Sequence, residues 1–262
     1  MDIASLITSL NPWILFPLVI GLGIAAAELG VWLGKKTIAK EGKDGSISSM
    51  VGSMLALLAF MLGFTFSYTS TRFATRRELV VEQAKALSTC YLRSDLIPAK
   101  QKQEMRGMLV QYTDVLAGMK TSSDVDRSVP LLERLNMKIW DEAATLANET
   151  MDSELRALYI RGINEVVEIY QKRKTVGLVY RIRGPIWTTL FVLFLLSMIL
   201  AGYEISVHKR RRLFNVAFMA TAFALIVTLI ADMDSRAESR NFKANLQPLE
   251  DVQKMMHDRG AD

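Results

Sequence analysis

The amino-acid sequence predicts an all-α fold, with four transmembrane helices and a helical extramembrane domain inserted between the second and third spans. The first observation that predicts it is that residues 3–27, 45–71, 184–203 and 213–231 contain no Asp, Glu, Lys or Arg. Because a helix needs about 20 mostly apolar residues to cross the bilayer core, each run has or approaches the length of a span. Four buried helices of a soluble core are the alternative, but such helices are usually shorter and less uniformly apolar.

The second observation is the charged region between the two pairs of runs. Residues 72–183 hold 19 Lys or Arg and 15 Asp or Glu, and their apolar residues recur at helical spacing. We therefore divide the chain into a first transmembrane helix pair (1–71), a charged helical extramembrane domain (72–183), a second transmembrane helix pair (184–231) and a polar C-terminal tail (232–262).

The boundaries of the individual helices follow from local signals. Residues 1–11 carry Asp2 and no Lys or Arg, so the first run is interpreted as a span and not as a signal peptide, which begins with a positive segment. The second span is expected to continue as a stalk into the charged domain and to end before Pro98. The stretch "TSSDVDRS" (121–128) is expected to form a loop, with the next helix beginning at Ser128 or Val129 and a later one capped by Ser153.

Composition excludes several classes of protein. The single Cys90 excludes an internal disulfide, and two histidines cannot build a His-rich metal site. The sequence contains no nucleophile–base arrangement, no Gly-rich phosphate loop and no metal-ligand spacing, so we expect no enzyme, no cofactor and no metal. The net charge of +5 is concentrated near the ends of the spans, which favours lipid phosphates and not nucleic acid as partners.

Small residues predict close helix packing in the membrane. The second span has a small-residue seam at every third or fourth position, and the first span has a shorter run of the same kind: Ser49, Gly52, Ala56, Ala59, Gly63, Phe66 and Ser70, and Ala26, Gly30 and Gly34. Small residues let helix backbones approach closely in lipid, so we expect helix pairing within or between subunits. Chance clustering is the alternative.

The second span also carries candidates for an ion path. Phe60, Phe64 and Ser67 share one face beside Gly63, and could form a hydrophobic constriction that opens into a hydroxyl-rich segment. Those hydroxyls could equally bond back to their own helix. An arginine collar (Arg72, Arg76 and Arg77) follows, either as part of the path or only as a mark of the membrane boundary.

Three acids lie within or at the ends of spans. Glu28 is near the end of the first span, where an ionisable residue is a functional-site hypothesis unless it lies at the interface. Asp232 and Asp234 end the fourth span, and we assign them a boundary role.

The stretch "LLAFMLGFTFSYTSTRFATRRELVVEQAKALSTCYLRSDLIP" resembles the signature of the bestrophin-like membrane proteins, a family of largely unassigned function. The similarity resumes at "LYIRGINEVVEIYQKR" and "GPIWTTLFVLFLLSMILAGYE" and covers roughly residues 50–250. The chain departs from the family pattern at Gln83, where an acid is usual, at Lys85, where Asn is usual, and in "SRAESRN", which lacks the usual Pro and Gly.

The resemblance implies kinship with bestrophins, which are oligomeric anion channels with four spans and a helical region between spans two and three. We therefore expect a homo-oligomeric ion channel of anion type, with the second span near the axis and chloride or another anion as the permeating species. The alternative is a membrane-anchored interaction or sensor protein whose helical domain binds a partner. Ion flux from purified protein in liposomes separates the two.

Orientation is predicted from charge, for a multi-pass protein of the cell (inner) membrane. The two short linkers, residues 35–46 and 204–212, carry eight Lys or Arg against three acids, which predicts that both are cytoplasmic. In bestrophins, by contrast, the helical region faces the cytosol.

The charge-based orientation predicts that a cysteine at Ser123, in a Cys90→Ser background, reacts with a membrane-impermeant maleimide added to intact cells. The reason is that Ser123 lies in the extramembrane domain, on the side opposite the basic linkers. Labelling that appears only after lysis would contradict this orientation and support the bestrophin-like one.

Overall fold

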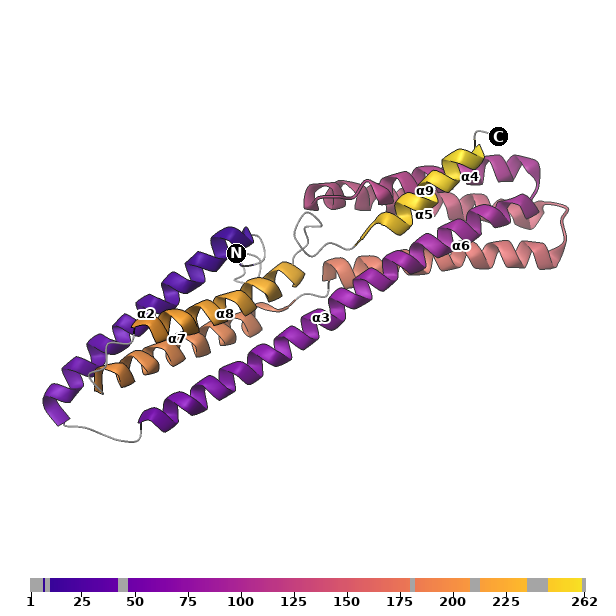
Figure 1. Ribbon diagram of the computed structural model, residues 1–262. Helices are drawn as coiled ribbons and strands as arrows, with labels where there is room; N and C mark the ends of the chain where they lie inside the picture. The colour runs from indigo at the N-terminus through magenta and orange to yellow at the C-terminus, as the bar shows by residue number, and fades with distance from the viewer. Residues whose placement is uncertain are drawn as a thin grey trace. The chain divides into compact units, whose positions relative to one another are not determined.

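The computed structural model describes residues 7, 10–41, 47–179, 182–207, 213–234 and 245–260. Every regular element within this part of the chain is a helix, which confirms the all-α fold class. Figure 1 shows the elements in chain order. The chain divides into two compact units, one formed by Met1–Thr71 with Arg181–Ser235 and the other by Arg72–Tyr180 with Arg236–Asp262.

The first unit contains four apolar helices, each long enough to cross a membrane. They are α2 (Pro12–Glu41), the first part of α3 (Ile47–Arg93), α7 (Gly184–Val207) and α8 (Leu213–Asp234). Length and composition qualify these four helices as spans among the described residues. The four predicted spans are therefore confirmed as helices.

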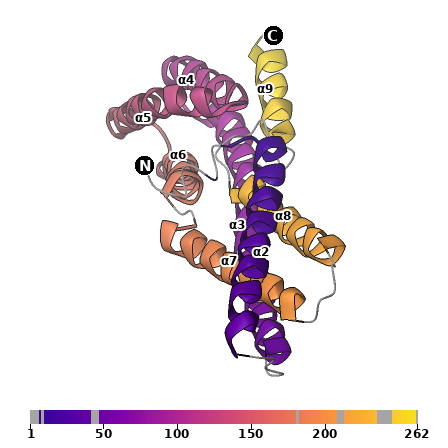
Figure 2. The ribbon, with the colours of Figure 1, turned by 90° about the vertical axis from the view of Figure 1, so that its left-hand side faces the viewer.

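Helix α2 packs directly on α7 and α8, which it crosses in Figure 2. A Cβ atom at Gly30 would lie 1.9 Å from the carbonyl oxygen of Ile199, and one at Gly202 would lie 2.0 Å from that of Ala27. Each glycine thus faces the backbone of the other helix, so α2 and α7 touch backbone to backbone. Gly34 extends the contact, since its Cβ would lie 2.8 Å from Cβ of Ser206.

The outer side of α2 has tryptophans near both ends of the span. Trp13 is 83% exposed and Trp32 is 57% exposed. At the 1.5 Å rise of an α-helix they are about 28 Å apart along the axis, close to the thickness of a bilayer core. Trp is enriched at both membrane–water interfaces. Lys36 lies beside the second of these tryptophans, with its Nζ 5.3 Å from the Trp32 ring centroid. The outer side of α2 therefore has the composition of a lipid-facing surface.

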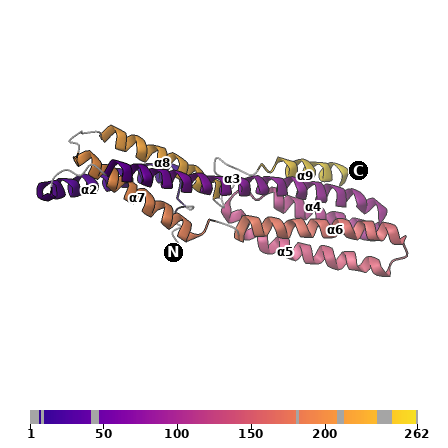
Figure 3. The same cartoon turned by 90° about the horizontal axis from the view of Figure 1, so that it is seen from below.

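The second unit is a bundle of helices that run alongside one another, as Figure 3 shows. It comprises the second part of α3, the 3-10 turn η1 (Ser94–Leu96), α4 (Ala99–Ala117), α5 (Ser122–Thr145), the 3-10 turn η2 (Leu146–Asn148), α6 (Ser153–Lys174), the π-helical η3 (Thr175–Val179) and α9 (Gln247–Gly260). Its core includes fully buried residues from five of these helices: Leu87, Cys90, Met105, Leu109, Tyr112, Leu132, Ile139, Tyr159, Ile163, Leu249 and Met256.

The expected stalk is confirmed, because α3 runs without interruption from Ile47 to Arg93. Two other helix starts differ from expectation. The predicted loop at residues 121–128 is wrong: α5 begins at Ser122, because Thr121 and Asp124 form a capping box that satisfies the first backbone N–H groups. Helix α6 is capped by Asp152 and not by Ser153, with Asp152 Oδ1 accepting from the N–H of Glu154 at 2.7 Å.

The C-terminal segment also differs from the polar tail expected over residues 232–262. Helix α8 continues to Asp234, and residues 247–260 form α9. Leu249 and Met256, seven positions apart, are fully buried in the core of the helical domain. The Tyr91 hydroxyl donates to the carbonyl oxygen of Met256 at 3.2 Å. The sequence did not indicate this helix, because a surface helix needs only a narrow apolar stripe and can be polar everywhere else.

Substituting Gly30 by Ala should destabilise the membrane unit, because the new methyl group would meet the backbone of α7. We expect a loss of about 1–3 kcal/mol in unfolding free energy. Gly21→Ala is the matched control on the same helix, since a Cβ at Gly21 meets nothing within 4 Å. Thermal or denaturant unfolding in detergent measures both. Equal stability of the two variants would contradict the backbone-to-backbone contact.

Candidate functional site

Within the membrane unit, one row of α3 side chains is buried against other parts of the same chain. Val51, Leu58, Leu62, Thr65 and Thr69 are all buried. They recur every three, four or seven residues, which places them on one side of a helix. Leu58 and Leu62 belong to the hydrophobic core that α2, α7 and α8 share. This inner row fixes how α3 is rotated about its axis.

The small-residue seam faces the other way. Six of its residues, Ser49, Gly52, Ala56, Ala59, Gly63 and Phe66, are exposed, and Ser70 at its end is half-buried. A Cβ atom at Gly52 or Gly63 would meet no described atom within 4 Å. The seam is therefore not a contact between the described helices of one chain, unlike Gly30 and Gly34 of α2.

The proposed constriction residues share this exposed side. Phe60 is 68% exposed and Phe64, one turn later, is 67% exposed, and Ser67 follows on the same face. Two large aromatic side chains thus project from a helix that has no charged residue between positions 45 and 71. Lipid, a water-filled path or another copy of the chain can each cover such a face.

Three of the hydroxyl groups at the end of the span bond to their own helix. Thr65 donates to the carbonyl oxygen of Met61 at 2.7 Å, Thr69 to that of Thr65 at 2.8 Å, and Thr71 to that of Ser67 at 3.0 Å. Thr65 and Thr69 are also buried against the chain's own helices. Thr71 is exposed although it bonds to its own helix, and Ser67 is exposed as well.

The arginine collar is divided between two sides of α3. The inner row continues without a change of spacing into two of the three arginines: Leu58, Leu62, Thr65, Thr69, Arg72 and Arg76. Arg72 is half-buried, and its Nη2 donates to the carbonyl oxygen of Val176 in η3 at 3.3 Å. Arg77, by contrast, is exposed and continues the spacing of the small-residue seam. The sequence did not separate the arginines because it shows their spacing but not the rotation of the helix.

The acids of the spans lie in different surroundings. Glu28 is exposed on α2, one turn before Trp32. Asp232 and Asp234 are buried at the end of α8, and the carboxylate of Asp234 accepts from the backbone N–H of Ile182 at 3.3 Å. Asp234 thereby connects the end of α8 to the segment that leads into α7, a role that no sequence motif indicated.

A family model of the bestrophin-like domain matches residues 21–235, which is most of the chain. The chain belongs to the bestrophin-like family. With its four apolar helices it is an integral membrane protein. No protein with a curated description is detectably similar to it.

Solved structures show the same bestrophin-like fold. The chain is similar to a single-residue mutant of a bacterial bestrophin homologue from Klebsiella pneumoniae, with 13% identity, a TM-score of 0.72 and coverage of 94% of this chain and 98% of that one. It is also similar to two mutants described only as a membrane protein, at 13% and 14% identity, TM-scores of 0.74 and 0.73, and coverage of 94% of this chain and 99% and 98% of those chains. At such identities the likeness shows the fold alone.

One departure from the bestrophin-like pattern has a structural counterpart. Gln83 is fully buried, and its Oε1 accepts from Nη1 of Arg173 at 2.9 Å. The amide therefore takes the place of the usual acid beside this arginine, but without its charge. Among the described residues, no group of three or more His, Cys, Asp or Glu could hold a metal ion.

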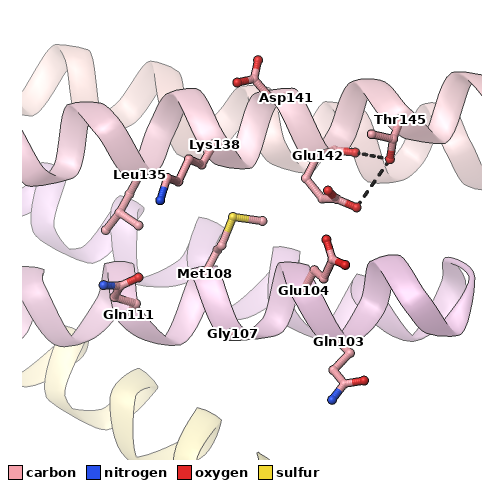
Figure 4. A pocket seen from close by; sticks show the side chains of 10 residues that line it. All are labelled: Gln103, Glu104, Gly107, Met108, Gln111, Leu135, Lys138, Asp141, Glu142 and Thr145. Carbon is pink, nitrogen blue, oxygen red and sulfur yellow. Dashed lines mark hydrogen bonds between the residues drawn. The ribbon is translucent and has the colours of Figure 1, made fainter.

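The bestrophin-like helical domain also has a groove that sequence reasoning missed. It lies between α4 and α5 and is shown in Figure 4. Acidic and apolar residues line it together, among them Glu104, Met108, Leu135, Asp141 and Glu142. No spacing rule within one helix could have found it, because its two walls are 38 residues apart in sequence at Glu104 and Glu142.

Proposed function

We propose that this bestrophin-like protein is a homo-oligomeric ion channel in which α3 lies near the axis. The observation that supports this most is the exposed side of α3 between Ser49 and Ser67. It is uncharged, rich in small residues, and not covered by the described helices of its own chain. Copies of α3 can approach closely along such a surface and leave a narrow path between them.

The contrast with α2 supports assigning the axis to α3. The outer side of α2 carries Trp13 and Trp32 near the two ends of the span, as a helix in contact with lipid does. While Phe66 and Tyr68 follow nearer the charged end, the two most exposed aromatic residues on the exposed side of α3, Phe60 and Phe64, lie in the middle of the span. Rings at that depth are suited to a constriction that controls wetting.

Anion preference is the finer part of the proposal, and it rests on the bestrophin resemblance and on Arg77. Arg77 is exposed in register with the seam, so each copy would present one guanidinium group near the charged end of the path. Like charges around a low-dielectric vestibule raise the local concentration of counter-ions. Arg72 is assigned a structural role, because it already donates to Val176.

We also propose that the protein resides in the cell (inner) membrane with both short linkers in the cytoplasm. Their basic clusters support this orientation. The lipids that surround α2, further copies of the chain and the permeating anion are the partners that this function requires.

The interaction or sensor function remains the second candidate because of one observation on the helical domain. Met137 is 64% exposed and Trp140 is 44% exposed, close together on α5. Large apolar side chains exposed near one another outside the membrane mark docking surfaces in many proteins. If the purified protein carries no ion flux in liposomes of any lipid composition, this result would favour the second candidate.

The oligomer should depend on the seam. Gly63→Leu places a bulky side chain where copies of α3 would meet, at a cost of about 1–3 kcal/mol per contact. We expect a lower mass in detergent by light scattering. Gly21→Leu is the control, because Gly21 is equally open but lies on α2. An unchanged mass for Gly63→Leu would remove the seam from the interface.

The two kinds of collar arginine should behave differently in liposomes with asymmetric chloride. Arg77→Gln should move the reversal potential toward lower anion preference, most at low salt, where screening is weakest. Arg72→Gln should leave the reversal potential near that of the parent and instead lower the thermal midpoint, because the bond to Val176 is lost. The proposed path would be contradicted if Arg72→Gln, and not Arg77→Gln, moved the reversal potential. An unchanged reversal potential for Arg77→Gln in a conducting channel would contradict it as well.

A further inference from the structure

The groove between α4 and α5 has an open and partly apolar floor. Met108 of α4 and Leu135 of α5 supply apolar atoms to it, and Gly107 lies next to Met108. A Cβ atom at Gly107 would meet no described atom within 4 Å, so the surface above this glycine is open. The groove has a volume of about 590 Å³, which is large enough to seat apolar side chains of a partner.

The charge of the groove is opposite to that of the domain around it. Its lining holds three acids against one base: Glu104, Asp141, Glu142 and Lys138. The whole helical domain, by contrast, has 19 Lys or Arg against 15 Asp or Glu. Figure 4 shows Glu104 and Glu142 pointing into the groove from its two walls. The groove therefore concentrates negative charge on a domain that is basic as a whole.

These three carboxylates do not hold the helices of the domain together. Among the described residues, none of the three forms a salt bridge. Other acids of the same two helices are paired across the domain, since Glu133 of α5 binds Lys174 and Asp114 of α4 lies 2.9 Å from Nε2 of His257. The acids of the groove are thus the ones that a cationic partner can reach without breaking a contact within the domain.

We propose that this groove is the docking site of a basic amphipathic helix of a partner protein. Apolar side chains on one face of that helix would lie over Gly107, Met108 and Leu135. Lys or Arg side chains beside that face would meet Glu104 and Glu142, and the complementary charge would set the orientation of the helix.

The shape of the groove favours a helix as its occupant. The lining residues extend over 103–111 on α4 and 135–145 on α5. These stretches are about 12 and 15 Å long at the 1.5 Å rise of an α-helix. Helices that bind in grooves use apolar anchors at positions i, i+3, i+4 and i+7, which extend over about 10 Å and so match this length.

The apolar surface continues along α5 beyond the groove. Met137 lies one turn before Asp141, Trp140 is the direct neighbour of Asp141, and both apolar side chains are exposed. Met and aromatic residues are enriched in protein interfaces. A partner helix wider than the groove would therefore cover them too. This docking site does not depend on the proposed ion path, so its test does not use ion flux.

The probe is a synthetic peptide of about 14 residues, held helical by a side-chain staple, with Leu at positions i, i+3, i+4 and i+7 and Lys at the flanking positions. Fluorescence anisotropy measures its binding to the purified full-length protein in detergent, with protein-free micelles as the blank. We expect saturable binding that weakens as salt is added, because salt screens the charges. A scrambled peptide of the same composition, which has no apolar face, should bind about tenfold more weakly.

Two kinds of variant test the floor and the charge separately. Gly107→Leu fills the open floor and should weaken binding about tenfold, while the thermal midpoint stays the same or rises, because Leu is the better helix former and has room there. Glu104→Gln combined with Glu142→Gln should weaken binding about fivefold. The matched control is Glu165→Gln with Glu168→Gln, which removes two exposed carboxylates from α6 outside the groove and should leave binding unchanged.

The docking site would be overturned if the stapled Lys peptide showed no saturable binding at low salt. Binding that neither Gly107→Leu nor the paired groove variant weakens would overturn it as well, because the peptide would then bind elsewhere. Equal affinity for the scrambled peptide, or full competition by spermine at the same concentration, would show that the groove recognises positive charge alone and not a helix.

Discussion

The close packing of α2 on α7 at Gly30 and Gly202 is the constraint on which the rest of the membrane unit depends. It lets the backbones of α2 and α7 meet, with each glycine set against a carbonyl of the other helix. In lipid, where helices gain little from hiding apolar surface, such close packing is a main source of association. Because α2 is committed to α7 and α8, it is not available to cover the outer side of α3. The free surface of α3 is thus a consequence of where α2 packs.

The fold could be predicted from the sequence to a large extent, because the membrane imposes a strong rule. Four charge-free runs of sufficient length become four helices, and the uninterrupted helix of residues 47–93 follows from the lack of a breaker at its charged end. The helices outside the membrane were harder to place. Pro130 is typical of a first helical turn and so favours a start after the capping box at Thr121. Helix α9 shows only two buried residues, Leu249 and Met256, in a polar segment.

The candidate site could be predicted only in part, since a sequence gives spacing but not partners. The small residues of α2 and α3 look alike in sequence, yet Gly30 meets a backbone and Gly63 meets nothing in the described chain. Arg72 and Arg77 likewise look equivalent until the buried row fixes the rotation of α3. Glu104 and Glu142 line one groove through the tertiary packing of α4 and α5, so no pattern within either helix indicates it.

The unbroken course of α3 has one further consequence, which concerns insertions and deletions. A single residue added between Leu62 and Thr65 would turn the rest of the span by about 100°, since an α-helix has 3.6 residues per turn. Thr65 and Thr69 could then no longer share one side with Leu58 and Leu62. Seven added residues would restore the alignment to within about 20°. The length of the span is therefore constrained in steps of a heptad by its inner row.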